Sequence, residues 1–360
     1  MSAEVKPAYG LNRVRLGNVV PLDMPFTVFL SVSTVCNFKC KYCIHVLSKE
    51  HLADKGFIPE IMTWDTFELA AEQISRFPGR LKTIFLYGVG EPLCNKLLPR
   101  MVRHLKDMDV ADQIAFITNG ALLDRKMSDA LIDAGLDTIR FSIQGITSEK
   151  YFDICGAKID FGSLVENIRY LYRNRKQCEV FVKIADVALD EGDEDQFYAI
   201  FGEISDRMFV ERIVPVFHEI DYSNMIREAT VTDLWGNEHE TRLVCPICFY
   251  TLTVFPNGDV YPCCMESDPA GLGNIRHEPL TEIWNGRKHT AFMRMQLEKK
   301  RMQNRICKTC TAPDTSAKLE DELDSCAQNI LARFEDHKGL HCSPPLTSAT
   351  GETSLQSLHA

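Results

Sequence analysis

Short apolar segments alternate with amphipathic segments of helical length between residue 26 and about residue 215. The apolar segments are rich in Ile, Val and Phe, as expected for buried strands of a parallel sheet. We expect strands at residues 26–33, 83–87, 113–118, 137–143, 179–185 and 208–214. Six strands that alternate with helices indicate parallel βαβ units, but they are too few for a closed eight-stranded barrel. The sequence therefore predicts an α/β fold with an open (β/α)6 partial barrel of the TIM type.

Three of the segments between these strands carry recognisable helix signals. Residues 63–77 begin with Thr63, a suitable N-cap, and residues 124–134 end before Gly135, a suitable residue for a helix C-terminus. Residues 161–174 place their apolar side chains on one stripe. We therefore expect amphipathic helices that pack on the sheet.

Glycine-bearing or polar turns follow the first four strands. A cysteine-rich loop at residues 36–43 follows the first strand, and the other turns lie at residues 87–93, 118–120 and 141–145. Ligands of open parallel sheets bind at the carboxyl ends of the strands. The sequence therefore predicts a binding site at this end of the barrel.

Three cysteines of the first loop, Cys36, Cys40 and Cys43, lie within eight residues. Spacings of three and two residues allow one loop to place three thiolates on one small object. Structural zinc requires a closed tetrahedral set of four ligands, whereas a [4Fe–4S] cluster can be held by three thiolates with one iron left open. We therefore expect such a cluster here.

The spacing CxxxCxΦC, with Tyr42 before the last cysteine, resembles the signature of the radical S-adenosylmethionine (SAM) superfamily. The resemblance covers roughly residues 26–215. It implies that SAM binds the open iron and is cleaved by one electron to a 5′-deoxyadenosyl radical, which abstracts a hydrogen from the substrate. It also implies flavodoxin or ferredoxin as the electron donor. Val89 departs from the family pattern, since many members have glycine there.

The resemblance further implies which residues contact SAM. A carboxylate beside the methionyl ammonium is physically reasonable, because it pairs a cation in a dry site. The implied contacts are Tyr42 to adenine, Gly90 and Glu91 to the ammonium, Asn119 and Ser142 to the ribose or methionyl group, and Lys183 as a weaker candidate for the methionyl carboxylate.

A second group of cysteines occupies residues 245–310. Residues 251–262 predict a β-hairpin with its turn at Asn257-Gly258, which would bring Cys245 and Cys263 together. A helix expected at about residues 280–299 leads to a CxxC pair at Cys307 and Cys310. Four thiolates from these elements can close around one zinc ion or one cluster.

This second group resembles the SPASM/twitch extension of radical SAM enzymes, which carries auxiliary [4Fe–4S] clusters. A full SPASM module has further cysteines shortly after the CxxC pair, and this chain lacks them. The resemblance therefore implies the shorter twitch form, with one auxiliary cluster. The implied ligands are Cys245, Cys263, Cys307 and Cys310, with Cys248 as the alternative to Cys245, while Cys264 and Cys326 are not expected to be ligands.

Other polar residues give weaker signals. Cys94 and Cys155 are candidates for returning a hydrogen atom to a substrate radical, whereas Cys178 reads as a buried apolar residue. Charged groups after the strands that could bind a polar substrate are Asp153, His218, Glu219 and Asp221.

Composition excludes some classes of function. The chain has 360 residues, and 40 Lys and Arg against 50 Asp and Glu give a formal net charge of −10, which disfavours nucleic-acid binding as the main task. The sequence has no run of about 18 apolar residues and no signal peptide, so we expect a cytoplasmic protein without a membrane span. Its fourteen cysteines then indicate metal binding or catalysis and not disulfides.

We expect five regions along the chain. They are a lead-in (1–25) that reads as irregular, the radical SAM partial barrel (26–215), a polar connection (216–244), the auxiliary-cluster domain (245–335) and a loosely ordered tail (336–360).

The favoured function is a radical SAM oxidoreductase that acts on a small polar molecule. The twitch form is similar to that of an aminocyclitol dehydrogenase, so we expect oxidation of an alcohol in a sugar, sugar nucleotide or cyclitol, with the auxiliary cluster accepting an electron. Alternatives are a redox-neutral epimerase or dehydratase, a peptide maturase, and a zinc or iron–sulfur binding module without enzymatic activity. Maturases often carry an N-terminal leader-binding domain, for which 25 residues before the first strand are too few.

Overall fold

The computed structural model describes residues 3–7, 13–54, 57–226, 232–238, 241–263 and 271–338. Its strands form one sheet in the order β1-β7-β6-β5-β4-β3-β2-β8-β9-β10. Six consecutive strands are parallel, and each lies beside the next along the chain. These strands are β2 Thr27–Leu30, β3 Leu81–Phe85, β4 Ala111–Thr118, β5 Thr138–Ile143, β6 Glu179–Ala185 and β7 Arg207–Glu211. The predicted α/β partial barrel is confirmed.

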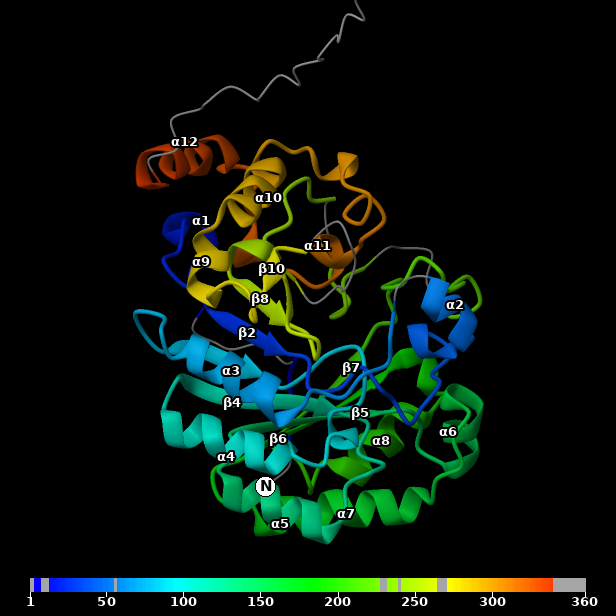
Figure 1. Ribbon diagram of the computed structural model, residues 1–360. Coiled ribbons are helices and arrows are strands. Elements are labelled where there is room, and N and C mark those ends of the chain that lie inside the picture. The colour runs from blue at the N-terminus through cyan, green and yellow to red at the C-terminus, as the bar shows by residue number, and fades with distance from the viewer. Residues whose placement is uncertain are drawn as a thin grey trace, which may run out of the picture.

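Amphipathic helices connect these strands and cover the outer face of the sheet, where α4, α5 and α7 lie together (Figure 1). The Thr63 side chain accepts a hydrogen bond from the backbone of Thr66 and begins α3, while Gly135 takes a positive φ of 84° at the end of α5. Their apolar side chains join those of the strands in one large buried core. The helices are α2 Lys49–Asp54, α3 Trp64–Ile74, α4 Leu98–Met108, α5 Arg125–Ala134, α6 Ser148–Cys155, α7 Phe161–Asn174 and α8 Asp193–Phe201.

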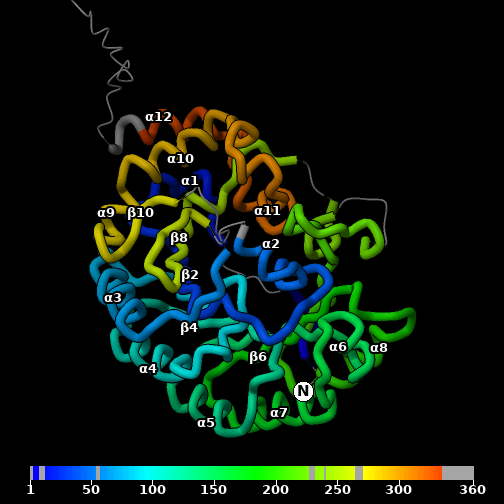
Figure 2. Tube along the Cα trace, turned by 45° about the vertical axis from the view of Figure 1, so that its right-hand side comes forward, coloured from blue at the N-terminus to red at the C-terminus, as the bar shows by residue number. Residues whose placement is uncertain are grey.

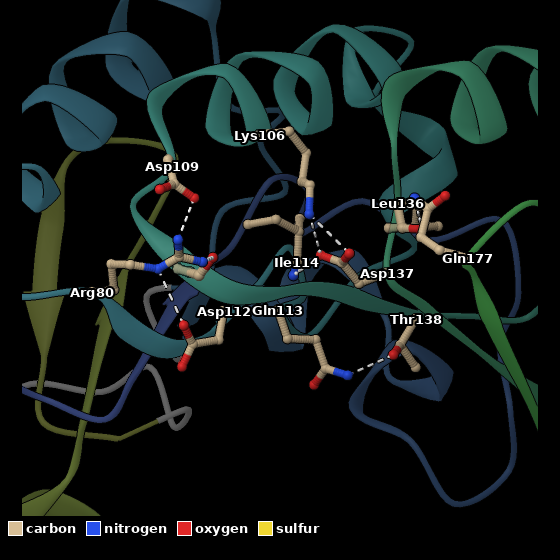
Figure 3. Close-up of polar contacts among 11 residues, drawn as sticks. Arg80, Lys106, Asp109, Asp112, Gln113, Ile114, Leu136, Asp137, Thr138 and Gln177 are labelled. Atoms are coloured by element: carbon tan, nitrogen blue, oxygen red, sulfur yellow. Dashed lines mark hydrogen bonds and ion pairs between the residues drawn. The ribbon is translucent and has the colours of Figure 1, made fainter.

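Polar contacts fasten the amino-terminal ends of the strands, away from the predicted site (Figure 3). Lys106 of α4 donates to Asp137 at 2.8 Å, and the same carboxylate accepts from the backbone N–H of Ile114 at 2.8 Å. Arg80 pairs with Asp112 at 3.1 Å. These contacts hold β3, β4 and β5 in register at their amino-terminal ends. The carboxyl ends of the strands are left open to ligands.

The two edges of the barrel sheet carry pairings that the sequence did not predict. β1 Glu4–Val5 lies in the segment expected to be irregular, and it pairs in parallel with β7. β8 Thr251–Val254 pairs in parallel with β2, so the predicted hairpin, completed by β9 Asp259–Tyr261, continues the barrel sheet. β10 Gly273–Asn274 follows β9. The second cysteine region is thereby joined to the strand that leads into the first.

The helix expected at residues 280–299 is wrong in one respect, because it is two helices, α9 Leu280–Asn285 and α10 Arg287–Leu297. Gly286 between them has an extended conformation with ψ 164°, which cannot continue a helix. In Figures 1 and 2, α9, α10 and α12 gather beyond the β8 edge. Apolar residues of α10, α12 and α1 build a second buried core, whereas those of α9 join the core of the barrel. The remaining helices are α1 Leu16–Val19, α11 Ala312–Thr315 and α12 Ala327–Lys338.

Within the described ranges, no helix has the length and apolar character needed to cross a membrane.

Candidate functional site

The turn after β3 packs directly on the segment that leads into the first cysteine loop. A Cβ on Gly90 would lie 2.5 Å from the Val35 carbonyl oxygen and 2.6 Å from that of Ser33, so only glycine fits this approach. The backbone N–H of Glu91 donates to the Val35 carbonyl at 2.8 Å. His45 Nε2 donates to the carbonyl of Val89 at 3.0 Å. The glycine turn and the cysteine loop therefore form one rigid wall.

The Glu91 carboxylate is buried inside this wall and has three protein donors. It accepts from the Leu93 backbone at 3.0 Å, from the Thr118 hydroxyl at 2.6 Å and from the Asn119 backbone at 2.8 Å. Burial raises the pKa of Glu91, and these hydrogen bonds oppose that rise. Because an ionised carboxylate has about four acceptor positions, one remains for a ligand cation. The proposed contact of Gly90 and Glu91 with an ammonium therefore depends on that position and on nearby backbone carbonyls.

The first cysteine loop is docked on the carboxyl end of α6. The backbone N–H groups of Lys39 and Lys41 donate to the carbonyls of Cys155 (3.0 Å) and Ile154 (2.9 Å), which are among the terminal carbonyls that a helix leaves unpaired. The Asn119 side chain donates to Asn37 Oδ1 at 2.8 Å and so ties the loop to the end of β4. These contacts fix the loop that carries the three thiols.

The thiols of Cys36, Cys40 and Cys43 lie close enough to interact electrostatically with one another. Burial is the largest cause that raises the pKa of Cys36, to about 12, and of Cys43, while for Cys40 a hydrogen bond with Cys155 is the largest cause and burial the second. Thiols bind metal as thiolates, so loading this site must release protons. Across the described ranges, no group of three or more His, Cys, Asp or Glu side chains is arranged to hold a single metal ion. The donor set is all thiol, which fits a cluster whose separate irons each take one thiolate.

A cavity of about 370 Å³ opens at the carboxyl ends of β3, β5, β6 and β7. Its wall is largely apolar, with a few polar groups. The hydroxyl of Tyr42 donates to Gln144 Oε1, and Lys183 pairs with Glu211 at 2.5 Å. Residues of both cysteine regions reach it, and the lining includes Tyr42, Cys43, Gly88, Ser142, Gln144, Lys183, Glu211, Arg212 and Cys310.

The second group of thiols gathers beside this cavity. Cys245 interacts electrostatically with Cys307 and Cys310, and Cys248 interacts with Cys245, Cys263 and Cys307. Burial raises the pKa of Cys245 to about 12 and that of Cys248 well above its usual value. The structure thus brings together the four predicted ligands and also their alternative, Cys248. Cys264 lies outside the described residues.

Two further residues hold this thiol group in place. The Gln296 side chain accepts from the Cys245 backbone N–H at 3.2 Å and donates to the Cys307 sulfur at 3.4 Å. Arg301 donates to the carbonyls of Cys307 (2.9 Å) and Cys310 (2.5 Å). Neither residue could be predicted from the sequence, because a polar residue on or just after an amphipathic helix gives no signal until the thiols are located.

Several weaker candidates lie elsewhere. The Cys155 thiol is buried against Cys40 and donates to the Tyr151 carbonyl at 2.8 Å. Cys94 interacts electrostatically with Cys36 and Glu91. Neither cysteine lines the cavity. The charged candidates and the other two cysteines also lie outside its lining; they are Asp153, His218, Glu219, Asp221, Cys178 and Cys326. By contrast, the cavity includes Gln144, Glu211 and Arg212, which were not predicted. The sequence signal that could have identified them is a polar residue at the last position of a strand or just after it.

Two family models match this chain. Residues 30–198 match the profile of the radical SAM superfamily, and residues 245–311 match SPASM, described as an iron–sulfur cluster-binding domain. A tungsten-containing aldehyde ferredoxin oxidoreductase cofactor-modifying protein from Pyrococcus furiosus is 24% identical over 74% of this chain and 82% of its own length. A GTP 3′,8-cyclase from Staphylococcus carnosus is 33% identical, but the match spans only 39% of this chain and 40% of the cyclase.

Two solved structures share the fold. BtrN in complex with AdoMet and 2-DOIA aligns with a TM-score of 0.50 at 19% identity, over 80% of this chain and 93% of BtrN. SuiB of Streptococcus suis, bound to the precursor peptide SuiA, aligns with a TM-score of 0.58 at 14% identity, over 77% of this chain and 68% of SuiB. At these identities the likeness establishes the architecture alone.

Proposed function

Because the chain belongs to the radical SAM superfamily and carries a SPASM iron–sulfur domain, we propose that it oxidises an alcohol group of a small polar molecule. A sugar, a sugar nucleotide or a cyclitol is the proposed substrate class. One observation carries this proposal. A single cavity is lined by Cys43 of the first cysteine loop and by Cys310 of the second. A substrate held there would lie between the two proposed cluster sites.

The first loop supplies the SAM end of the cavity. When bound, the cluster of a radical SAM enzyme supplies the electron that cleaves SAM, and the resulting 5′-deoxyadenosyl radical abstracts a substrate hydrogen. Cys36, Cys40 and Cys43 would hold this cluster. Tyr42 and Ser142, both on the cavity wall, would orient the adenosyl group, and the Gly90–Glu91 turn would receive the methionyl ammonium.

The chemistry of the other end follows from the electron balance. Loss of a hydrogen atom from a carbinol carbon leaves a carbon radical, and forming the ketone then requires loss of the hydroxyl proton and one electron. Glu211 lines the cavity and would accept the hydroxyl proton, and Lys183, 2.5 Å away, would orient a neighbouring hydroxyl. Cys310, with Cys245, Cys263 and Cys307 as the other proposed ligands, would hold the auxiliary cluster, which would supply the acceptor for this electron.

Cavity size supports a small substrate. The volume of about 370 Å³ lies near the lower end of ligand pockets. An apolar wall with a few polar groups fits a compact molecule that is oriented by two or three hydrogen bonds. The likeness to SuiB, which binds a peptide, is one of fold, so a peptide substrate remains the second candidate in the experiment below.

The experiment is anaerobic incubation of the reconstituted enzyme with SAM, reductant and a panel of sugars, sugar nucleotides and cyclitols. We expect one member to yield a ketone lighter by two hydrogens, with one 5′-deoxyadenosine formed per ketone. A product of unchanged mass with altered stereochemistry would replace oxidation by epimerisation. Activity on a peptide panel alone would overturn the small-molecule assignment.

A further inference from the structure

A buried hydrogen-bond donor and a buried positive charge lie beside the second thiol group, and neither is needed to supply its ligands. Gln296, in the last turn of α10, is fully buried, and its amide N–H donates to the Cys307 sulfur at 3.4 Å. Its oxygen is fixed by the backbone N–H of Cys245 at 3.2 Å, so the donor cannot rotate away. A hydrogen bond from an amide to a ligand sulfur stabilises added negative charge at an iron–sulfur site.

Arg301 supplies a buried positive charge at the same place. Its residue is 4% exposed, and its guanidinium donates to the backbone carbonyls of Arg242 (2.9 Å), Cys307 (2.9 Å) and Cys310 (2.5 Å). Within the described part of the chain these partners are all neutral, so no carboxylate cancels its charge by direct pairing.

The charge of Arg301 is directed at the thiols. It interacts electrostatically with Cys245, Cys307 and Cys310, whereas Asp314 opposes it at Cys310. Asp314 is itself held by the backbone N–H of Arg242 at 2.7 Å. Because Coulomb interactions are stronger in a buried, poorly solvated site, the net effect at the three thiols favours added negative charge.

We infer that Gln296 and Arg301 are positioning residues that raise the reduction potential of the auxiliary centre and so make it a better electron acceptor. Reduction adds one negative charge to the centre, and both residues stabilise that charge. The inference rests on the proposed function in one respect, since it gives the second centre the electron that alcohol oxidation releases.

The test is a spectroelectrochemical titration of the reconstituted full-length protein, followed by electron paramagnetic resonance, without any substrate. We expect Arg301→Gln and Gln296→Glu each to lower the equilibrium constant for one-electron reduction of the auxiliary centre by about tenfold, which corresponds to about 59 mV. The first centre, titrated in the same sample, should keep its potential. Lys288→Met removes an exposed charge from α10, the helix that carries Gln296, and should leave the reduction potentials of both centres unchanged.

A conservative variant separates charge from scaffolding. Arg301→Lys keeps the positive charge but loses the forked donors, so the account expects a potential close to that of the wild type. If Arg301→Lys shifts as far as Arg301→Gln, the residue is a scaffold for the CxxC segment and the electrostatic role is refuted. Gln296→Met, which lacks a donor and a charge, should shift the potential in the same direction and replaces Gln296→Glu if that variant binds less iron.

Unchanged potentials in iron-replete Arg301→Gln and Gln296→Met would overturn the inference. Because the titration contains no substrate, this result is independent of whether the enzyme oxidises an alcohol. Conversely, if the variants show shifted reduction potentials but the wild-type enzyme forms no ketone product, the proposed function is refuted and the inference stands.

Discussion

Replacing Gly90 by alanine tests whether close packing of the glycine turn on the cysteine loop is required for SAM cleavage. The added Cβ would lie 2.5 Å from the Val35 carbonyl oxygen and 2.6 Å from the Ser33 carbonyl oxygen, both backbone atoms that cannot rotate aside. The two segments must therefore separate by roughly 0.9 Å to reach ordinary contact at 3.4 Å. A displacement of about 1 Å at reacting groups can cost about 100-fold in rate. We expect SAM cleavage to fall by about that factor, with a stability loss of about 1–3 kcal/mol.

The assay is chromatographic measurement of 5′-deoxyadenosine formed anaerobically under reductant, with iron content and thermal unfolding measured on the same protein. Gly162→Ala is the matched control, because Gly162 lies in the first turn of α7 and its Cβ would meet only the Asp160 carboxylate at 3.4 Å. The control should cleave SAM at the wild-type rate and be unchanged or slightly more stable. Wild-type cleavage by Gly90→Ala would refute the packing argument.

Two further predictions concern the charged pair that lines the cavity and the lysine at position 318. The side chains of Lys183 and Glu211 are 21% and 14% exposed. A double-mutant cycle of Lys183→Met and Glu211→Gln in urea unfolding should therefore give a coupling free energy of about 1–3 kcal/mol, whereas the exposed pair Lys176 and Asp133 should give about 0–1 kcal/mol. Equal coupling free energies for the two pairs would contradict the burial of the cavity pair. Burial lowers the pKa of Lys318 from 10.5 to about 6, so the unfolded chain binds more protons between these values, and stability should rise with pH from about 6 upward. Lys318→Met should lack this rise in unfolding midpoints measured at both ends of that window, and a variant that keeps the full wild-type slope would show that the lysine titrates normally.

The strands of the barrel could be predicted because each is a short apolar segment in a regular alternation, and local pattern determines such elements. The pairing of β2 with β8 could not, since it joins residues more than two hundred positions apart and depends on tertiary packing. β1 has two residues, too few for any period. The break at Gly286 was missed because an isolated glycine within a helical pattern is usually tolerated.

The site divides in the same way. Cysteine spacing is a local signal, so both thiol groups were located from sequence, and the structure gathers them. Other site residues owe their roles to the groups that they contact in the folded chain, and local sequence does not determine those contacts. They are Gln144, Glu211, Gln296 and Arg301. The choice between Cys245 and Cys248 also stays a prediction, because both thiols lie in the same buried group.

The central claim is that two separate iron–sulfur centres flank one substrate cavity. The most direct test is the iron and sulfide content of anaerobically purified protein, compared between the wild type and the Cys307→Ala/Cys310→Ala variant. The account predicts about eight irons falling to about four, with the variant still cleaving SAM to 5′-deoxyadenosine on reduction. About four irons in both proteins, with zinc lost from the variant, would contradict it. The second thiol group would then be a structural zinc site, and alcohol oxidation would lose its electron acceptor.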